Sequence, residues 1–185
     1  SDNGGVLDAN GPDVEHGGNA QTNNGHLHNG SLRAGKGSPY EGGTRVPFVV
    51  RWSGHIKPGA SDALICHVDI LAAMAALTGQ KLVDSAGPDS FNVLPALLGE
   101  KLDQPCRDHL VEHGNVLAIR KGPWKLIPGN PAGAANKEGK KRNGSGDQLY
   151  NLAEDIGETN NVAAAHPDLV KELADLFRLS RFQEE

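Results

Sequence analysis

The sequence is short of aromatic residues, long hydrophobic runs and basic charge, and each shortage limits what the protein can be. Aromatic residues make up only 4% of the 185 residues, so the hydrophobic core cannot be rich in large rings. No apolar run approaches the roughly 18 residues that a membrane-spanning helix needs. Lys and Arg total 18 against 23 Asp and Glu, and the net charge of −5 argues against a nucleic-acid-binding domain, which usually has a basic excess.

The two cysteines, Cys66 and Cys106, leave the redox compartment open. Neither belongs to a Cys-x-x-Cys pair or to a cluster of Cys and His with metal-ligand spacing. They can pair in an oxidising compartment or stay free as small core residues. The sequence also begins without an initiator Met and without a basic-then-apolar signal, so we expect a processed product or a fragment.

The first half of the sequence predicts a long loop, one buried strand and two helices. Residues 6–31 are rich in Gly and Asn and have few apolar side chains, which is typical of a surface loop. The nearly continuous apolar run Val46–Trp52 predicts a strand buried on both faces, as in a parallel or mixed sheet. Helices are predicted over Val68–Leu77, which is rich in alanine and leucine, and as a short turn over Asn92–Leu98. A glycine follows each helix and suits its end.

The second half predicts a small antiparallel sheet covered by one helix. Short apolar runs separated by turn signals indicate a meander of four strands, which are His109–Glu112, Val116–Arg120, Trp124–Ile127 and, after a Gly- and Lys-rich exposed insertion over 129–147, Gln148–Asn151. The amphipathic segment Pro167–Arg181 predicts a helix whose apolar face packs most simply on the meander. We therefore expect an α/β fold, with part of an α/β layer over residues 1–105 and the sheet with its helix over 106–185.

Asp2 and Asn3 stand before two glycines and are the first candidate site. A carboxylate and an amide carbonyl suit Ca²⁺ or Mg²⁺, and glycine lets the backbone turn tightly around an ion. An ordinary turn uses the same residue types, so both interpretations stay open. Ca²⁺ takes about 6–8 oxygens, and these two residues supply at most about three or four, so further ligands must come from elsewhere.

Lys36, between Gly35 and Gly37 just before the predicted strand, is the second candidate. Its ammonium can be approached closely, and its three donors fit a tetrahedral oxyanion. An ordinary surface lysine in a flexible loop has the same pattern. His26 and His28 are candidate ligands or proton donors beside Lys36, or solvated loop histidines.

Two arginines near Lys36 have competing interpretations. Arg33 and Arg45 can each bind an anion. Glu41 stands four residues before Arg45, however, and an ion pair that stiffens the turn before the strand is the favoured interpretation of Arg45. Asn29-Gly30-Ser31 matches the glycosylation sequon, a short match that often arises by chance.

These residues together resemble the formylglycine-dependent sulfatases. The resemblance rests on Ser-Asp-Asn-Gly-Gly at the start and on Leu-Arg-x-Gly-Lys-Gly-x-x-Tyr-Glu-Gly-Gly-x-Arg-Val-Pro before an apolar segment ending Trp-x-Gly. It implies the C-terminal part of an alkaline-phosphatase-like α/β sandwich. It also implies that Asp2 and Asn3 bind one active-site Ca²⁺, that Lys36 holds the sulfate ester as a catalytic residue, and that His26 and His28 line the substrate site. A periplasmic, extracellular or lysosomal location is implied as well.

The resemblance further implies a hydrated formylglycine nucleophile, made from a Cys or Ser in Cys/Ser-x-Pro/Ala-x-Arg. That motif is absent, because Cys66 precedes His-Val-Asp-Ile, Cys106 precedes Arg-Asp-His-Leu and no serine begins it. We therefore expect part of a sulfatase with half of its site, inactive alone, whose partners are a small or saccharide sulfate ester and the N-terminal part of the same protein. The segment Val46–Trp52 should then expose apolar surface and an open strand edge.

Two rival functions stay open from the sequence. One keeps the same superfamily and changes the substrate to a phosphate or phosphonate ester. The other is a non-catalytic module that retains only the ability to bind an anion.

Overall fold

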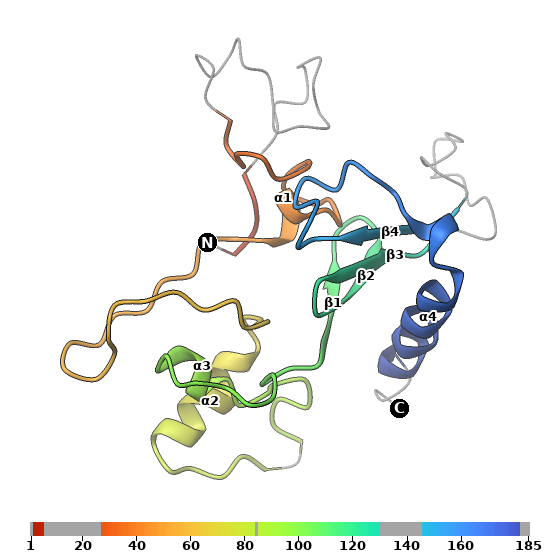
Figure 1. Ribbon diagram of the computed structural model, residues 1–185. Helices are drawn as coiled ribbons and strands as arrows, with labels where there is room; N and C mark the ends of the chain where they lie inside the picture. Colours follow the sequence, from red (N-terminus) through yellow and green to blue (C-terminus); the bar gives the residue numbers. More distant parts are fainter. Residues whose placement is uncertain (1, 6–26, 84, 130–145, 182–185) are drawn as a thin grey trace. The chain divides into compact units, whose positions relative to one another are not determined.

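The computed structural model describes residues 2–5, 27–83, 85–129 and 146–181, and the chain forms two compact units (Figure 1). The sheet unit combines Ser1–Pro47 with Val111–Glu185, and the helical unit is Phe48–Leu110. The expected division of the longer protein at residues 105 and 106 stays a prediction. No helix among the described residues is long and apolar enough to cross a membrane.

The sheet unit is built on four strands in the order β1-β2-β3-β4. The strands are β1 (His109–His113), β2 (Leu117–Lys121), β3 (Trp124–Ile127) and β4 (Gln148–Asn151). Strand β3 pairs antiparallel with both β2 and β4, and Lys125 lies opposite Arg120 on one side and Tyr150 on the other. The predicted meander is confirmed. The insertion predicted over 129–147 falls almost wholly outside the described residues.

Helix α4 (Pro167–Arg181) packs on one face of this sheet, as its amphipathic pattern predicts. Leu173 is fully buried there against three strand residues, Ile119, Leu126 and Leu149. Burying one leucine in this way contributes about 1.5–3 kcal/mol to folding. Because side chains alternate along a strand, the neighbours of these residues point to the opposite face.

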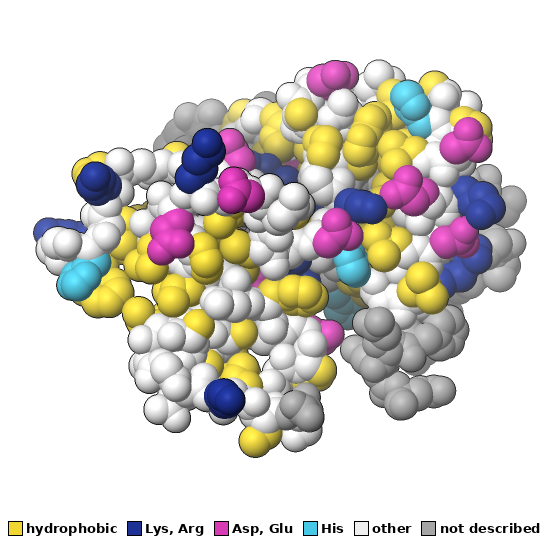
Figure 2. All heavy atoms as spheres, turned by 60° about the horizontal axis from the view of Figure 1, so that its bottom comes forward, with side chains coloured by type: hydrophobic (Ala, Val, Ile, Leu, Met, Phe, Trp, Pro, Cys, Tyr) yellow, Lys and Arg dark blue, Asp and Glu magenta, His cyan; other side chains and the backbone are white. Residues whose placement is uncertain are grey.

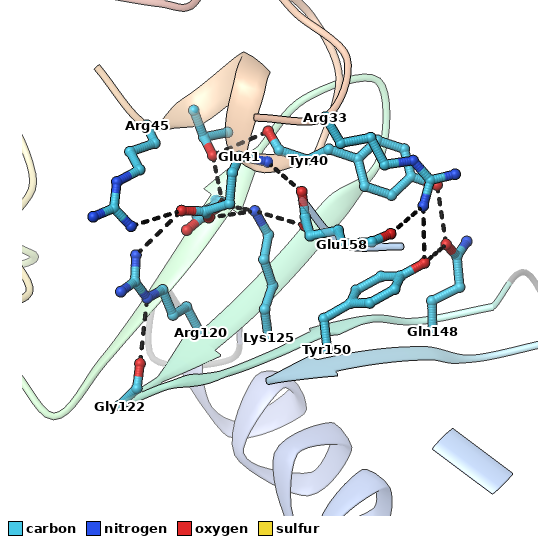
Figure 3. A network of polar contacts seen from close by, with 12 residues as sticks. Arg33, Tyr40, Glu41, Arg45, Arg120, Gly122, Lys125, Gln148, Tyr150 and Glu158 are labelled. Atoms are coloured by element: carbon cyan, nitrogen blue, oxygen red, sulfur yellow. Dashed lines mark hydrogen bonds and ion pairs between the residues drawn. The ribbon is translucent and has the colours of Figure 1, made fainter. Parts of the chain in front are cut away.

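The opposite face of the sheet carries a second, smaller core and the short helix α1 (Glu41–Thr44). Ala118, Ile127, Tyr150 and Leu152 form this core, and Tyr40 packs against it. Figure 3 shows α1 above the strands and α4 below them. The sheet therefore separates an apolar interface with α4 from an interface with the Lys36 loop.

The helical unit contains α2 (Asp69–Leu77) and α3 (Leu94–Leu97), so both predicted helices are confirmed. The Asp69 carboxylate is completely buried and accepts hydrogen bonds from Arg107 at 2.6 and 3.0 Å. It also accepts the backbone N–H groups of Cys66 and Phe91 at 2.7 and 2.9 Å. One carboxylate thus connects the start of α2 to two other segments. Both cysteines are free and half-buried.

The prediction of a buried strand over Val46–Trp52 is wrong in this structure. Residues 45–52 form no helix or strand, and Phe48, Val49, Val50 and Trp52 are 41%, 89%, 41% and 40% exposed. A strand needs neighbours for its N–H and C=O groups, and none of the four strands formed by the described residues pairs with this segment. The expected exposure of apolar surface is confirmed, and hydrophobic side chains are visible at the molecular surface in Figure 2.

Candidate anion and metal site

Two backbone hydrogen bonds join the segment that carries Asp2 and Asn3 to the loop that carries Lys36. The Gly4 N–H donates to the carbonyl of Gly43 at 3.0 Å, and the Lys36 N–H donates to the carbonyl of Gly5 at 3.0 Å. Segments more than thirty residues apart in sequence are thereby held side by side. The carboxylate, the amide and the ammonium predicted as site residues therefore lie on one connected piece of backbone.

Close backbone contacts explain why glycine occupies Gly4 and Gly42. A β-carbon on Gly4 would lie 1.7 Å from the carbonyl oxygen of Gly42, and one on Gly42 would lie 2.2 Å from the carbonyl oxygen of Ala34. Real β-carbons essentially never come this close to backbone atoms, so any larger residue would push the two segments apart. The geometry of the site thus depends on main-chain contacts.

The side-chain amide of Asn29 forms hydrogen bonds with both segments, the one that carries Asp2 and the loop that carries Lys36. Its Oδ1 accepts the Gly5 N–H at 2.8 Å, and its Nδ2 donates to the carbonyl of Ala34 at 2.7 Å. Ala34 has a φ of +57°, a left-handed conformation that is unfavourable for a residue with a β-carbon. The amide of the sequon Asn29-Gly30-Ser31 is therefore engaged inside the fold.

His28 lies beside the junction of these two segments, whereas His26 lies outside the described residues. A β-carbon on Gly5 would be only 2.8 Å from the β-carbon of His28, which places this histidine against the segment that follows Asn3. His28 and Lys36 are both exposed, as a group that meets a ligand from solvent must be. Four of the five predicted site residues, Asp2, Asn3, His28 and Lys36, thus lie on segments that contact one another, while their roles stay predictions.

Asp2 and Asn3 fit a Ca²⁺ ion in chemistry but supply only part of its coordination. Asp2 is exposed, and the Asn3 amide nitrogen donates to a carboxylate oxygen of Asp2 at 2.8 Å. Both residues carry the hard oxygen donors that Ca²⁺ prefers. Within the described ranges, no group of three or more His, Cys, Asp and Glu forms a complete metal site. A Ca²⁺ ion held here would need ligands in addition to these two.

A buried ion cluster around Glu41 and Lys125 is a feature that the sequence did not predict (Figure 3). The Lys125 ammonium, completely buried on β3, lies 2.9 Å from Glu41, 2.8 Å from Glu112 and 3.5 Å from Glu158. Glu41 also lies 3.2 Å from Arg45 and 3.6 Å from Arg120. Three cationic side chains thus face three carboxyl groups within the sheet unit.

Burial and charge act in opposite directions on the pKa values of this cluster. Burial alone would lower the pKa of Lys125, but the three carboxylates outweigh it and raise the pKa, so the ammonium stays charged. Burial alone would raise the pKa of Glu41, but Lys125 and then Arg120 and Arg45 hold it below its usual value. For Glu158 burial prevails over the attraction of Lys125, the nearby charges of Glu41 and Glu112 add to it, and the pKa rises to about 7.

The raised pKa of Glu158 predicts a stability that falls as pH rises. The folded state binds a proton on this carboxyl up to about pH 7, whereas the unfolded chain releases it near 4.5. The contribution is complete below pH 4.5 and is lost as pH rises through about 7, a loss of about 3 kcal/mol. Urea unfolding of wild type and Glu158→Gln between pH 4.5 and 8 measures it. Parallel pH dependences in the two proteins would contradict the prediction.

The two arginines near Lys36 have structural partners. The pairing of Arg45 with Glu41 is confirmed. Arg33 donates to the carbonyl of Glu158 at 2.8 Å and to the hydroxyl of Tyr150 at 3.1 Å, and its guanidinium lies 4.0 Å from the centre of the Tyr40 ring. Arg33 thus joins the Lys36 loop to the sheet, and neither arginine needs an anion to explain its position.

Most of the chain is similar in sequence to known proteins. The family model described as Sulfatase matches residues 1–80, which include Asp2, Asn3 and the Lys36 loop. The N-acetylgalactosamine-6-O-sulfatase of Bacteroides thetaiotaomicron is 43% identical over 180 residues, which are 95% of this chain and 34% of that protein. Human arylsulfatase A is 33% identical over 169 residues, 80% of this chain and 32% of that protein. This chain belongs to the sulfatase family.

Solved structures show the same likeness. A structure from work on glycosaminoglycan metabolism by Bacteroides thetaiotaomicron has a TM-score of 0.75 and 43% identity, covering 86% of this chain and 34% of that one. The crystal structure of Ps i-CgsB has a TM-score of 0.64 and 27% identity, covering 83% and 32%. The chain spans about a third of the length of these relatives, and its size fits a C-terminal portion.

Proposed function

We propose that this chain supplies part of the anion and metal site of an enzyme that hydrolyses sulfate esters. The observation that carries the proposal is the pair of backbone hydrogen bonds, each 3.0 Å long, that holds the Asp2–Asn3 segment against the Lys36 loop. These bonds hold the backbones of the two segments side by side, which supports a single site that combines an ammonium with hard oxygen ligands. Membership of the sulfatase family supports sulfate as that anion.

Each site residue has a distinct role in this proposal. Lys36 is the catalytic cation, since its ammonium offsets the negative charge that develops on the ester and sulfate oxygens as the S–O bond breaks. Asp2 and Asn3 would hold a Ca²⁺ ion, which supplies Lewis-acid polarisation of a bound oxyanion. His28 lies at the edge of the site and contacts the substrate, and His26 is proposed for the same role. The formylglycine nucleophile comes from outside this chain.

The rest of the same protein is the proposed partner of the helical unit. Phe48, Val50 and Trp52 are each at least 40% exposed, and they follow directly on the loop that carries Lys36. Burying them would remove an apolar surface that a soluble domain rarely leaves open. We propose that the remainder of an alkaline-phosphatase-like α/β sandwich covers them, that the 185-residue chain alone is inactive and that the protein is exported.

A sulfated saccharide is the substrate class to test first. One relative with 43% identity is named for a sulfated amino sugar, and Ps i-CgsB has been crystallised with a neocarrahexaose. The complete protein should hydrolyse a 6-O-sulfated N-acetylgalactosamine or a sulfated aryl ester and leave the matching phosphate esters almost unchanged. Faster hydrolysis of the phosphate esters would favour the phosphatase alternative, and inactivity on both ester types would favour a non-catalytic anion-binding module.

Asp2→Ala is expected to weaken Ca²⁺ binding by the complete protein at least about tenfold. Loss of an outer-shell residue already costs about 10–100-fold in metal affinity, and a direct ligand should cost no less. Isothermal titration with Ca²⁺ measures the change, and Asp62→Ala, at an exposed position in the helical unit, is the matched control. Equal affinities of the two variants would remove Asp2 from the metal site.

A further inference from the structure

We propose that Glu158 and Lys125 are positioning residues for the Lys36 site, acting through helix α1. The inference rests on the proposed function, because it concerns what holds that site in shape. Neither residue lies near the ligand-binding side chains in sequence, and both are completely buried. A series of contacts leads from the sheet to α1 and from α1 to the site.

The first step joins the sheet unit to the start of α1. Glu41 is held at both of its polar ends: its backbone N–H donates to Oε2 of Glu158 at 2.6 Å, and its carboxylate accepts from Lys125 at 2.9 Å. The N–H groups in the first turn of a helix have no partner inside the helix, so the Glu158 carboxylate satisfies a donor that would otherwise be buried alone. These two contacts fix where α1 begins.

The second step joins α1 to both halves of the site. The Gly42 N–H donates to the carbonyl of Arg33 at 2.8 Å, which fixes the loop just before Lys36. The Gly43 carbonyl accepts the Gly4 N–H at 3.0 Å, which fixes the segment just after Asn3. A shift of α1 therefore moves the ammonium and the carboxylate–amide pair relative to each other.

Two residues along this series of contacts have a strained backbone. Among the described residues, only Ala34 and Glu158 have a positive φ without being glycine, at +57° and +52°. Arg33 connects them, because it precedes Ala34 and its guanidinium donates to the carbonyl of Glu158 at 2.8 Å. Such conformations cost of order 1–3 kcal/mol and persist only where the surrounding structure over-determines them.

The experiment compares Glu158→Ala, Glu158→Gln and Leu173→Ala in the complete protein. Leu173→Ala is the matched control, because it weakens the same sheet from the α4 face without touching α1. We measure the dissociation constants for inorganic sulfate and for Ca²⁺, the steady-state constants for a sulfate ester, and the unfolding midpoint. Should Glu158→Ala not fold, Glu158→Asp replaces it, since its shorter carboxylate also withdraws from the Glu41 N–H.

We expect Glu158→Ala to weaken sulfate binding about tenfold and to lower kcat/KM at least as much. Glu158→Gln keeps an acceptor for the Glu41 N–H and should stay within about threefold of wild type. Leu173→Ala should lower the unfolding midpoint and leave binding unchanged. The inference is overturned if Glu158→Ala binds sulfate as wild type does, or if Leu173→Ala weakens binding equally. Lys36→Ala separates the two proposals: normal activity in that variant would overturn the proposed function itself.

Discussion

Lys36→Ala in the complete protein is expected to lower kcat/KM for a sulfate ester by about 10²–10³-fold. The ammonium is the cation that the proposed site offers to the anion, and removing one preorganised donor to a developing oxyanion typically costs this much. Most of the loss should appear in kcat, because the charge that Lys36 offsets is greatest in the transition state. Initial rates over a range of substrate concentrations separate kcat from KM.

Lys57→Ala is the matched control for this prediction. Lys57 is an exposed lysine of the helical unit, and its removal changes the net charge of the protein by the same amount. It should leave both constants within about twofold. A decrease in Lys36→Ala that is no larger than in Lys57→Ala would mean that Lys36 contributes only long-range attraction of the anion.

Lys125→Met is expected to destabilise the sheet unit by about 3–5 kcal/mol. The substitution keeps the apolar stem and removes the ammonium that three buried carboxylates share, and an uncompensated buried charge costs this much. Hydrogen exchange of the β3 amides in the complete protein measures the free energy of local opening. The destabilisation caused by Lys125→Met should decrease at low pH, where the carboxylates are neutral.

Lys121→Met, on the neighbouring strand β2, is the control for the buried lysine. Its ammonium lies 3.1 Å from Glu172 of α4, but both side chains are more than a third exposed. Exposed ion pairs contribute about 0–1 kcal/mol, so the same substitution should change little here. Equal losses in the two variants would show that the ion cluster adds nothing beyond the packing of the lysine stem.

The elements that form from local contacts could be predicted from the sequence. Helix α4 begins and ends at the predicted residues, because Pro167 suits a first turn and the apolar residues repeat on one face. The strands of the meander follow short apolar runs separated by turns, and Gly122, with a φ of +54°, provides the bend between β2 and β3. Hydrophobic pattern and turn chemistry decide these elements without long-range information.

Contacts between distant segments could not be predicted. The spacing of Glu41 and Arg45 predicts their ion pair, which exists, but the shorter contact of Glu41 is with Lys125, 84 residues further on. A lysine inside an apolar strand is a weak signal that a buried carboxylate lies opposite. The prediction of a strand over Val46–Trp52 is wrong for a related reason, since its apolar pattern suits a strand with neighbours, and none of the strands among the described residues pairs with it.

The candidate site could be predicted from the sequence in part. The residue types of Asp2, Asn3 and Lys36 indicated hard ligands and an anion, and the resemblance to a family placed them in one site. The contact between the two segments that carry these residues depends on Gly4 and Gly5. Their hydrogen bonds to the loop that carries Lys36 have no sequence signal beyond the glycines themselves. Main-chain hydrogen bonds of this kind are visible only in the structure.

The tight contact between Gly4 and Gly42 has a consequence for how such a site can diversify. Because main-chain atoms hold the two segments together, the exposed side chain at position 28, at the edge of the proposed site, can change without disturbing the framework that presents it. New specificity for a differently shaped or charged ester can then arise by single substitutions. Gly4 and Gly42 cannot be replaced in this way, so we expect both glycines to be kept while the exposed side chain changes.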